Sequence, residues 1–290
     1  MLYLLCHPGC RCFIPFLQNF EYLFNKNGVE CKFVLSYDPY TDNGEDLWIV
    51  IWNGLSVLPR RCIIYNMDPM VPHIEQGLRS LIIRSRKYKI LKLVDYCYGL
   101  NPTKLDNIEL PKSILTYGYS PYHAMLKQKL VPANTKKDID ILFYGNVSER
   151  RIPMITALGN LSKQKGYSFM LRHNNLFNEE EKIQTIARAK VIVSFASNDT
   201  KLFHGNDLAR SAQVISSGGF IITEYIGDET VETKMSEYVP HYNTVEELVS
   251  KVDYYLTNPD EREKLIALAS EKFPQDFNLE KGLMDLISDV

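Results

Sequence analysis

Cationic side chains gather in loops that follow the predicted strands of the second half of the chain. They are Arg150, Arg151, Arg172, His173, His204 and Arg210. In an open parallel sheet, ligands bind at the carboxyl ends of the strands, where loop amides and helix N-termini converge. Arginine side chains and a helix N-terminus can together neutralise a diphosphate without a metal ion. The sequence therefore predicts an anion site at this edge, although an arginine pair also suits a solvated helix start.

Alternating strands and helices position these loops. Apolar runs predict strands at 2–6, 29–36, 47–52, 61–65, 89–94 and 113–117, and again at 139–144, 167–171, 191–195 and 220–223. The spacing of apolar residues predicts helices at 13–25, 73–85, 207–217 and 245–256, and Asn178, Thr244 and Asn258 are expected to cap helices. Most of the strands lack strict alternation, as in parallel sheets covered on both faces. The predicted fold class is α/β, with two Rossmann-like doubly wound domains.

A polar stretch and the distribution of cysteines divide the chain. Residues 127–137 (KQKLVPANTKK) hold one proline and four lysines, so they are predicted to be a linker. All six cysteines lie in the first hundred residues, which suggests two separately built halves. We therefore expect an N-terminal domain at 1–126 and a second domain at 138–278.

Composition and charge exclude several classes of protein. The chain has 290 residues, of which 45% are hydrophobic, and a net charge of −2; neither disorder nor a general attraction to nucleic acid is expected. No run approaches the ~18 apolar residues that a membrane span needs. Cysteine is too sparse for a secreted disulfide scaffold, so we expect reduced thiols and a cytoplasmic location. The basic run at 79–92 suits a solvated helix face or a peripheral contact with a membrane surface.

Four runs carry a likeness to a known family: 138–151 (DIDILFYGNVSERR), 187–195 (ARAKVIVSF), 210–224 (RSAQVISSGGFIITE) and 254–268 (YYLTNPDEREKLIAL), with fainter likeness at 63–69, 94–101 and 117–121. They resemble the GT-B glycosyltransferases, most closely the group-1-like branch that includes CgeB-type proteins. The resemblance implies transfer of a sugar from a nucleotide-diphosphate sugar to a glycan or glycoconjugate hydroxyl. It also implies two domains facing each other across a cleft, a C-terminal helix at 279–290 that returns to the first domain, and neither metal nor cofactor.

The resemblance assigns donor contacts to the second domain. They would come from Gly145, Asn146, Arg150, Arg151, Arg172, His173, His204, Asn206, Asp207, Arg210, Gln213, Ser217, Gly218 and Glu224. The family often carries Arg-x-x-Glu before its glycine turn, and its glutamate binds the donor ribose. Here that position holds Gln213, which can hydrogen-bond a hydroxyl but carries no charge. The alternative is that Gln213 is a surface helix residue.

A catalytic base is expected from the first domain. An inverting transferase needs a base within hydrogen-bond reach of the acceptor hydroxyl. The candidates are Asp68, His7 and Asp95, because each follows a predicted strand. The resemblance puts Asp68 first, since members of the family often carry a carboxylate at this place after Tyr-Asn. His7 could instead face the donor phosphate, and a cap, turn or core hydrogen bond would explain any of the three.

Other patterns and other functions stay open. The run Asp138-Ile139-Asp140 lies at the start of the predicted strand 139–144, which favours a cap at the solvent end of the strand over a metal motif. The cysteines near position 10 fit small buried residues better than a metal cluster. Tyrosines between positions 96 and 122 suit a glycan acceptor or ordinary half-buried strands. A 2-epimerase on the same fold and a non-catalytic glycan- or nucleotide-binding partner are the alternative functions.

Overall fold

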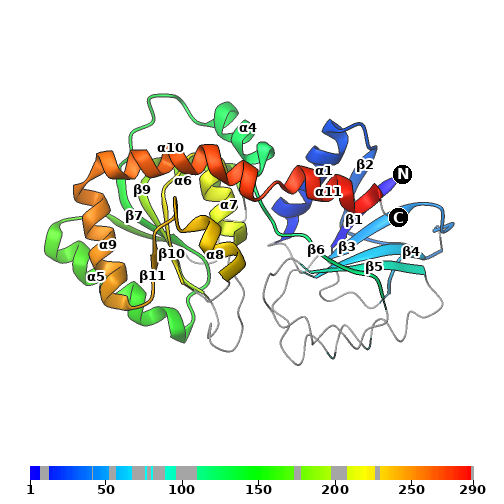
Figure 1. Cartoon of the computed structure of the whole chain (residues 1–290), viewed down its shortest axis with the longest axis horizontal. Coiled ribbons are helices and arrows are strands. Elements are labelled where there is room, and N and C mark those ends of the chain that lie inside the picture. Colours follow the sequence, from blue (N-terminus) through cyan, green and yellow to red (C-terminus); the bar gives the residue numbers. More distant parts are fainter. Residues whose placement is uncertain are drawn as a thin grey trace. The chain divides into compact units, whose positions relative to one another are not determined.

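The chain folds into two compact units (Figure 1). The computed structural model describes residues 1–6, 13–40, 42–51, 57–66, 76, 80, 89–95, 110–172, 178–196, 208–225 and 229–288. One unit comprises Met1–Thr116 and Leu279–Val290, and the other comprises Tyr117–Asn278. Within the described ranges, no helix has the length and apolar character needed to cross a membrane.

The first unit is built on a six-stranded sheet. Its strands lie in the order β2-β1-β3-β4-β5-β6, and all neighbouring pairs are parallel. The strands are β1 (Leu2–Cys6), β2 (Cys31–Val34), β3 (Leu47–Ile51), β4 (Arg61–Asn66), β5 (Lys89–Asp95) and β6 (Lys112–Ile114). Helices α1 (Ile14–Lys26) and α11 (Leu279–Ser288) belong to the same unit. The predicted helix at 73–85 falls almost wholly outside the described residues.

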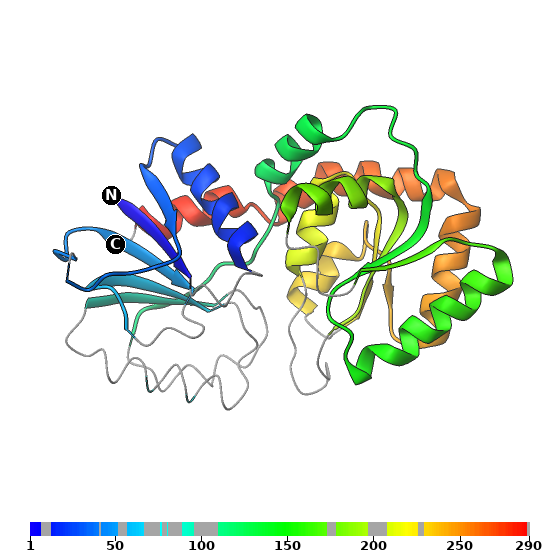
Figure 2. The same cartoon turned by 180° about the vertical axis from the view of Figure 1, so that it is seen from behind.

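Helix α1 joins the first sheet to the C-terminal segment. Its apolar face buries Leu17, Phe20 and Leu23 completely, and α11 packs along it. Lys26 Nζ donates to Glu280 Oε2 at 2.9 Å, and Asn27 Nδ2 donates to Glu280 Oε1 at 2.8 Å. The last helix therefore contacts the unit in which the chain begins, as Figure 2 shows from behind.

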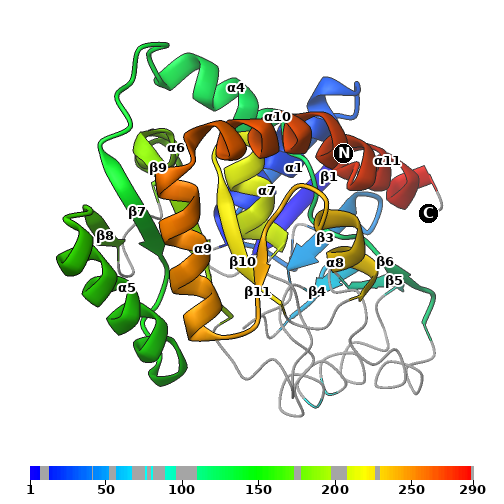
Figure 3. The same cartoon turned by 60° about the vertical axis from the view of Figure 1, so that its left-hand side comes forward.

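The second unit repeats the strand order of the first. Its sheet runs β11-β10-β9-β7-β8, and every pair is parallel. The strands are β7 (Ile139–Tyr144), β8 (Phe169–Arg172), β9 (Ala189–Ser194), β10 (Ile221–Glu224) and β11 (His241–Tyr242). The helices are α4 (Pro121–Leu130), α5 (Ile152–Lys165), α6 (Glu179–Arg188), α7 (Leu208–Ser216), α8 (Glu229–Met235), α9 (Val245–Thr257) and α10 (Pro259–Asp276). Figure 3 turns α9 and α10 toward the viewer.

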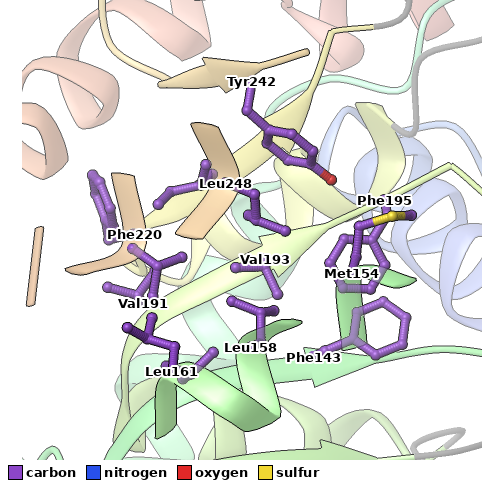
Figure 4. Packing of buried hydrophobic residues seen from close by; sticks show 13 residues of the cluster. Phe143, Met154, Leu158, Leu161, Val191, Val193, Phe195, Phe220, Tyr242 and Leu248 are labelled. Carbon is purple, nitrogen blue, oxygen red and sulfur yellow. The ribbon is translucent and has the colours of Figure 1, made fainter. Parts of the chain in front are cut away.

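Helices α5 and α9 cover one face of the second sheet. Leu158 from α5 and Leu248 from α9 pack with Val191 and Val193 of β9, and none of these side chains is exposed (Figure 4). The alternate strand residues Leu142 and Ile192 are also fully buried, because the opposite face is covered as well. The predicted α/β class with two Rossmann-like units is thus confirmed.

Helix α4 replaces part of the expected linker. Ser120 caps it by accepting a hydrogen bond from the His123 amide at 3.2 Å, and Pro121 occupies its first turn. Both features favour a helix start. The grouping of α4 with the second unit differs from the expected boundaries at 126 and 137, since the helix runs through Leu130.

Candidate functional site

The strand order of the second sheet reverses between β7 and β9, which is where such sheets bind ligands. Gly145 follows β7 with a φ of 144°, a conformation that L side chains rarely adopt. A Cβ atom at Gly145 would lie 3.3 Å from Arg151 Nη1 and 3.3 Å from Arg210 Nη2. Two guanidinium groups therefore flank the bare Cα of this glycine.

Arg151 ties the loop after β7 to the end of β9. Its Nη1 donates to Asn146 O at 2.7 Å, and its Nη2 donates to Phe195 O at 2.7 Å. Its Nε also lies 3.2 Å from Ala196 O. The side chain is only 4% exposed, so these carbonyl contacts replace the water that its charge would otherwise require.

Arg150 and Glu224 link the ends of three strands. Arg150 Nη1 donates to Glu224 Oε2 at 2.9 Å and to Ala196 O at 3.0 Å. Its Nη2 reaches the other carboxylate oxygen, so the pair is bidentate. The Ala196 amide donates to Glu224 Oε2 at 3.0 Å. Residues after β7 and β9 are thereby held to the last residue of β10.

Arg210 brings a third guanidinium group to this edge. It extends from α7, and its Nη1 donates to Ser194 Oγ at 2.8 Å. Its Cζ lies 5.3 Å from the ring centre of Tyr144, within cation–π range. Burial, and then the negative charge of Glu224, raise the pKa of Tyr242 well above its ordinary value. The Tyr242 hydroxyl therefore stays protonated and donates to Ser194 O at 3.0 Å.

This edge, hereafter the arginine edge, consists of Gly145, Arg150, Arg151, Arg210 and Glu224. Glu224 offsets one of its three guanidinium charges. The remaining positive charge, together with the end of a parallel sheet, suits an anion.

Other predicted donor residues are not part of the arginine edge, although the Gly145 amide donates to Arg172 O at 3.1 Å. Arg172 at the end of β8 is 44% exposed and contacts Glu181 Oε1 at 3.4 Å. Gln213 is 5% exposed, so its interpretation as a surface helix residue is wrong. Ser217 Oγ donates to Gln213 O at 2.7 Å, and Gly218 follows with a φ of 68°. These last residues are about 10 Å along the helix from Arg210, at ~1.5 Å per residue.

Several predicted site residues lie outside the described residues. They are His7, Asp68, His173, His204, Asn206 and Asp207, and the basic run at 79–92 does so in large part. The backbone of Asp95 ends β5 and lies opposite Asn66 in the register with β4. That position is the carboxyl end of the first sheet, as the sequence predicted.

Reasoning from the sequence missed a buried polar cluster of Ser120, His123, Glu179 and Lys182. His123 Nδ1 lies 2.5 Å from Ser120 Oγ, and its Nε2 lies 2.7 Å from Glu179 Oε1. Lys182 Nζ donates to Glu179 Oε2 at 2.6 Å. Burial alone would raise the pKa of Glu179, but the His123 hydrogen bond and the Lys182 charge lower it to about 2.

The order serine, histidine and carboxylate resembles a hydrolase relay, but Ser120 is fully buried and caps α4. The cluster therefore supports the packing of α4 on α6. Its only sequence signal was the Ser-Pro start of α4, since nothing local connects positions 123 and 179.

The aspartates of the Asp138-Ile139-Asp140 run lie at the amino end of β7. Asp138 Oδ2 accepts from Arg188 Nη2 at 2.8 Å, and Asp140 Oδ1 accepts from Lys190 Nζ at 2.5 Å. Among the cysteines, Cys31 and Cys62 are buried free thiols, and burial raises the pKa of each to about 12. Thiols with such pKa values are unreactive at neutral pH.

A family profile described as glycosyl transferase-like matches residues 127–288, which is more than half of the chain. No curated protein matches the sequence.

Among solved structures, WaaG, a glycosyltransferase involved in lipopolysaccharide biosynthesis, is similar with a TM-score of 0.56 and 12% identity over 99% of this chain and 100% of that chain. An alpha-glucosyltransferase in complex with UDP and a 13-mer DNA containing a HMU base reaches 0.63 with 9% identity over 100% and 99%. Trehalose-6-phosphate synthase OtsA reaches 0.54 with 11% identity over 85% and 72%. At these identities the likeness shows the fold alone, the GT-B fold.

Proposed function

The chain belongs to the glycosyl transferase-like family, and we propose that it transfers a sugar from a nucleoside-diphosphate sugar to a hydroxyl of a glycan or glycoconjugate. Membership of the CgeB-type branch is part of the proposal. The observation that carries it is the arginine edge at the strand-order reversal of the second sheet.

The donor diphosphate would lie over Gly145, beside Arg210. Breaking the glycosidic bond adds negative charge to the leaving nucleoside diphosphate, and fixed cations lower the energy of that charged state. Arg210 Nη2 lies 3.3 Å from the position that a Cβ of residue 145 would take, so the bare Cα leaves space next to a cation. We propose that this guanidinium supplies the charge and that transfer is metal-independent.

The acceptor side is proposed for the first unit. Asp68 remains the first candidate for the base, with His7 and Asp95 as alternatives. Asp68→Asn is expected to abolish turnover while nucleotide binding persists, because a base acts on the acceptor hydroxyl rather than on the donor. Unchanged turnover would remove Asp68 from the mechanism.

The proposed acceptor is a glycan in the cytoplasm rather than DNA. One similar structure is a complex with DNA, but a net charge of −2 offers little general attraction to a polyanion. A glycan, a glycolipid in vesicles and a DNA duplex, each offered with the donor, would separate these acceptors. The glycolipid arm also tests peripheral membrane contact by residues 79–92.

Nucleotide binding is the first experiment. Thermal unfolding is measured with UDP, GDP, dTDP and CMP and with their sugars, since a ligand at 100 times its Kd stabilises by about 2.7 kcal/mol. We expect one diphosphate to raise Tm in the parent protein and in the control Arg188→Ala, and to have little effect on Arg210→Ala. Conversion of the donor sugar without any acceptor would favour the epimerase. No shift with any nucleotide would contradict the proposal.

A further inference from the structure

We infer that Arg150 and Glu224 are a positioning pair, which acts on the donor only through the peptide groups of Ala196. This inference rests on the proposed function, because it assigns a role within the same donor site. It gives Arg150 and Glu224 a different task from Arg210, although all three lie at the arginine edge.

The pair encloses one residue of the backbone from both sides. Glu224 Oε2 accepts the Ala196 amide at 3.0 Å, and Arg150 Nη1 donates to the Ala196 carbonyl at 3.0 Å. The same carboxylate oxygen also accepts from Arg150 at 2.9 Å. Arg150 Nη2 contacts the other carboxylate oxygen of Glu224. The two side chains and the peptide groups of Ala196 therefore form a closed ring of hydrogen bonds.

Position makes this ring relevant to the donor. Ala196 follows the end of β9, the neighbour of β7 at the reversal of strand order, and Arg151 also donates to its carbonyl. The carbonyl oxygens of Phe195 and Ala196 carry partial negative charge that would repel a diphosphate. Because guanidinium groups donate hydrogen bonds to both carbonyls, that repulsion is reduced where the donor would bind.

Charge distinguishes the pair from Arg210. The guanidinium of Arg150 and the carboxylate of Glu224 cancel in net charge, and their side chains are 26% and 12% exposed. The pair therefore stabilises a bound anion by holding the end of β9 in place. Each of the two side chains needs the other to hold it. Two groups that act as one unit give non-additive effects when both are removed.

The experiment is a double-mutant cycle with Arg150→Met, Glu224→Gln and the combined variant. The Kd of the nucleotide selected by the thermal screen is measured by calorimetry below the Tm of every variant. We expect each single change to weaken binding about tenfold, a difference of about 1.4 kcal/mol, and the combined variant to bind no worse than either single variant. Arg150→Lys keeps the positive charge but loses the planar guanidinium group that contacts Glu224 and Ala196 together. It should weaken binding as much as Arg150→Met.

The matched control is the ion pair of Asp140 and Lys190 at the opposite end of β7 and β9. Asp140→Asn with Lys190→Met removes a pair from the same two strands, so it should lower Tm without changing Kd. If the increases in Kd of the two single variants multiplied in the combined variant, the inference would be overturned. Each side chain would then contact the nucleotide independently. Unchanged Kd in the single variants would overturn it too.

Failure of the proposed function would look different. If the parent protein bound no nucleotide in the thermal screen, the function itself would be wrong before any variant was made. If the parent binds and only the cycle is additive, the donor site stands and the positioning role falls. Should Arg150→Met not fold, Arg150→Lys enters the cycle in its place.

Discussion

Asp138 and Asp140 at the amino end of the second sheet accept hydrogen bonds from Arg188 and Lys190, whereas the carboxyl end gathers the arginine edge. The two ends share residue types but differ in surroundings. Arg188 is 43% exposed and contacts a carboxylate, whereas Arg151 is 4% exposed and contacts backbone carbonyls.

The comparison shows that position decides what a charged pair does. At the amino end, each carboxylate has a cation, and solvent screens the exposed pairs. At the carboxyl end, Arg151 donates to backbone carbonyls and Arg150 pairs with Glu224. Arg210 lies next to the Cα of Gly145, which carries no side chain. The second arrangement gathers three guanidinium groups around one carboxylate, Glu224.

Arg151→Ala should produce the largest effect and separate the two ends most clearly. The change leaves the carbonyls of Asn146 and Phe195 without their guanidinium donor, while Ala196 O keeps Arg150. Each buried acceptor that is left unsatisfied costs about 1–3 kcal/mol. The measurement is the free energy of unfolding in urea. Arg188→Ala, the amino-end control, should not change it measurably, and equal losses in both variants would contradict the contrast.

A buried charged group that belongs to neither end tests the role of burial. The folded pKa of Glu179, about 2, lies below its ordinary value of 4.5, so its stabilisation is complete above pH 4.5 and is lost as pH falls toward 2. The loss is on the order of 3 kcal/mol.

The free energy of unfolding is measured in urea between pH 5 and pH 2.5, and its slope against pH reports this loss. Glu179→Gln should flatten it, while Asp253→Asn, which removes a part-exposed carboxylate, should leave most of it. A slope that survives Glu179→Gln would assign the acid sensitivity to other carboxylates.

Gly145→Ala sharpens the contrast by adding one methyl group to the arginine edge. The new Cβ would lie 3.3 Å from Arg151 Nη1 and Arg210 Nη2, and we expect nucleotide Kd to rise about tenfold, or about 1.4 kcal/mol. Calorimetric titration measures it. Gly166→Ala is the matched control, because φ is also positive there (74°) and nothing lies within 4 Å of the added atom. Gly166→Ala introduces left-handed backbone strain away from the arginine edge and should leave binding unchanged, so weakened binding in both variants would argue against a local role.

Asp140→Asn alone should have the smallest effect. Its loss of the Lys190 ion pair is worth about 1 kcal/mol or less, because the pair is partly solvated. Chemical denaturation measures the difference, and nucleotide titration should detect none. A change in nucleotide affinity would mean that the two ends of the sheet are coupled.

Local signals predicted much of the fold. Asn178 accepts from the Glu180 amide and Thr244 from the Glu247 amide, as expected of caps. Asn258 differs: its side chain donates to Tyr254 O at the end of α9 and gives α10 no side-chain cap. The expectation that the Asn258 side chain caps the next helix is therefore wrong, because the turn between α9 and α10 directs that side chain to the end of α9.

The amino-acid sequence by itself determined the parallel α/β architecture and the loops that would carry cationic groups, because strand patterning and caps depend on neighbours a few residues away. Tertiary structure decided which arginine holds carbonyls, which meets Glu224 and which faces Gly145. Those contacts join residues 44 to 74 positions apart, and the burial that gives them their strength exists only once the sheet has assembled.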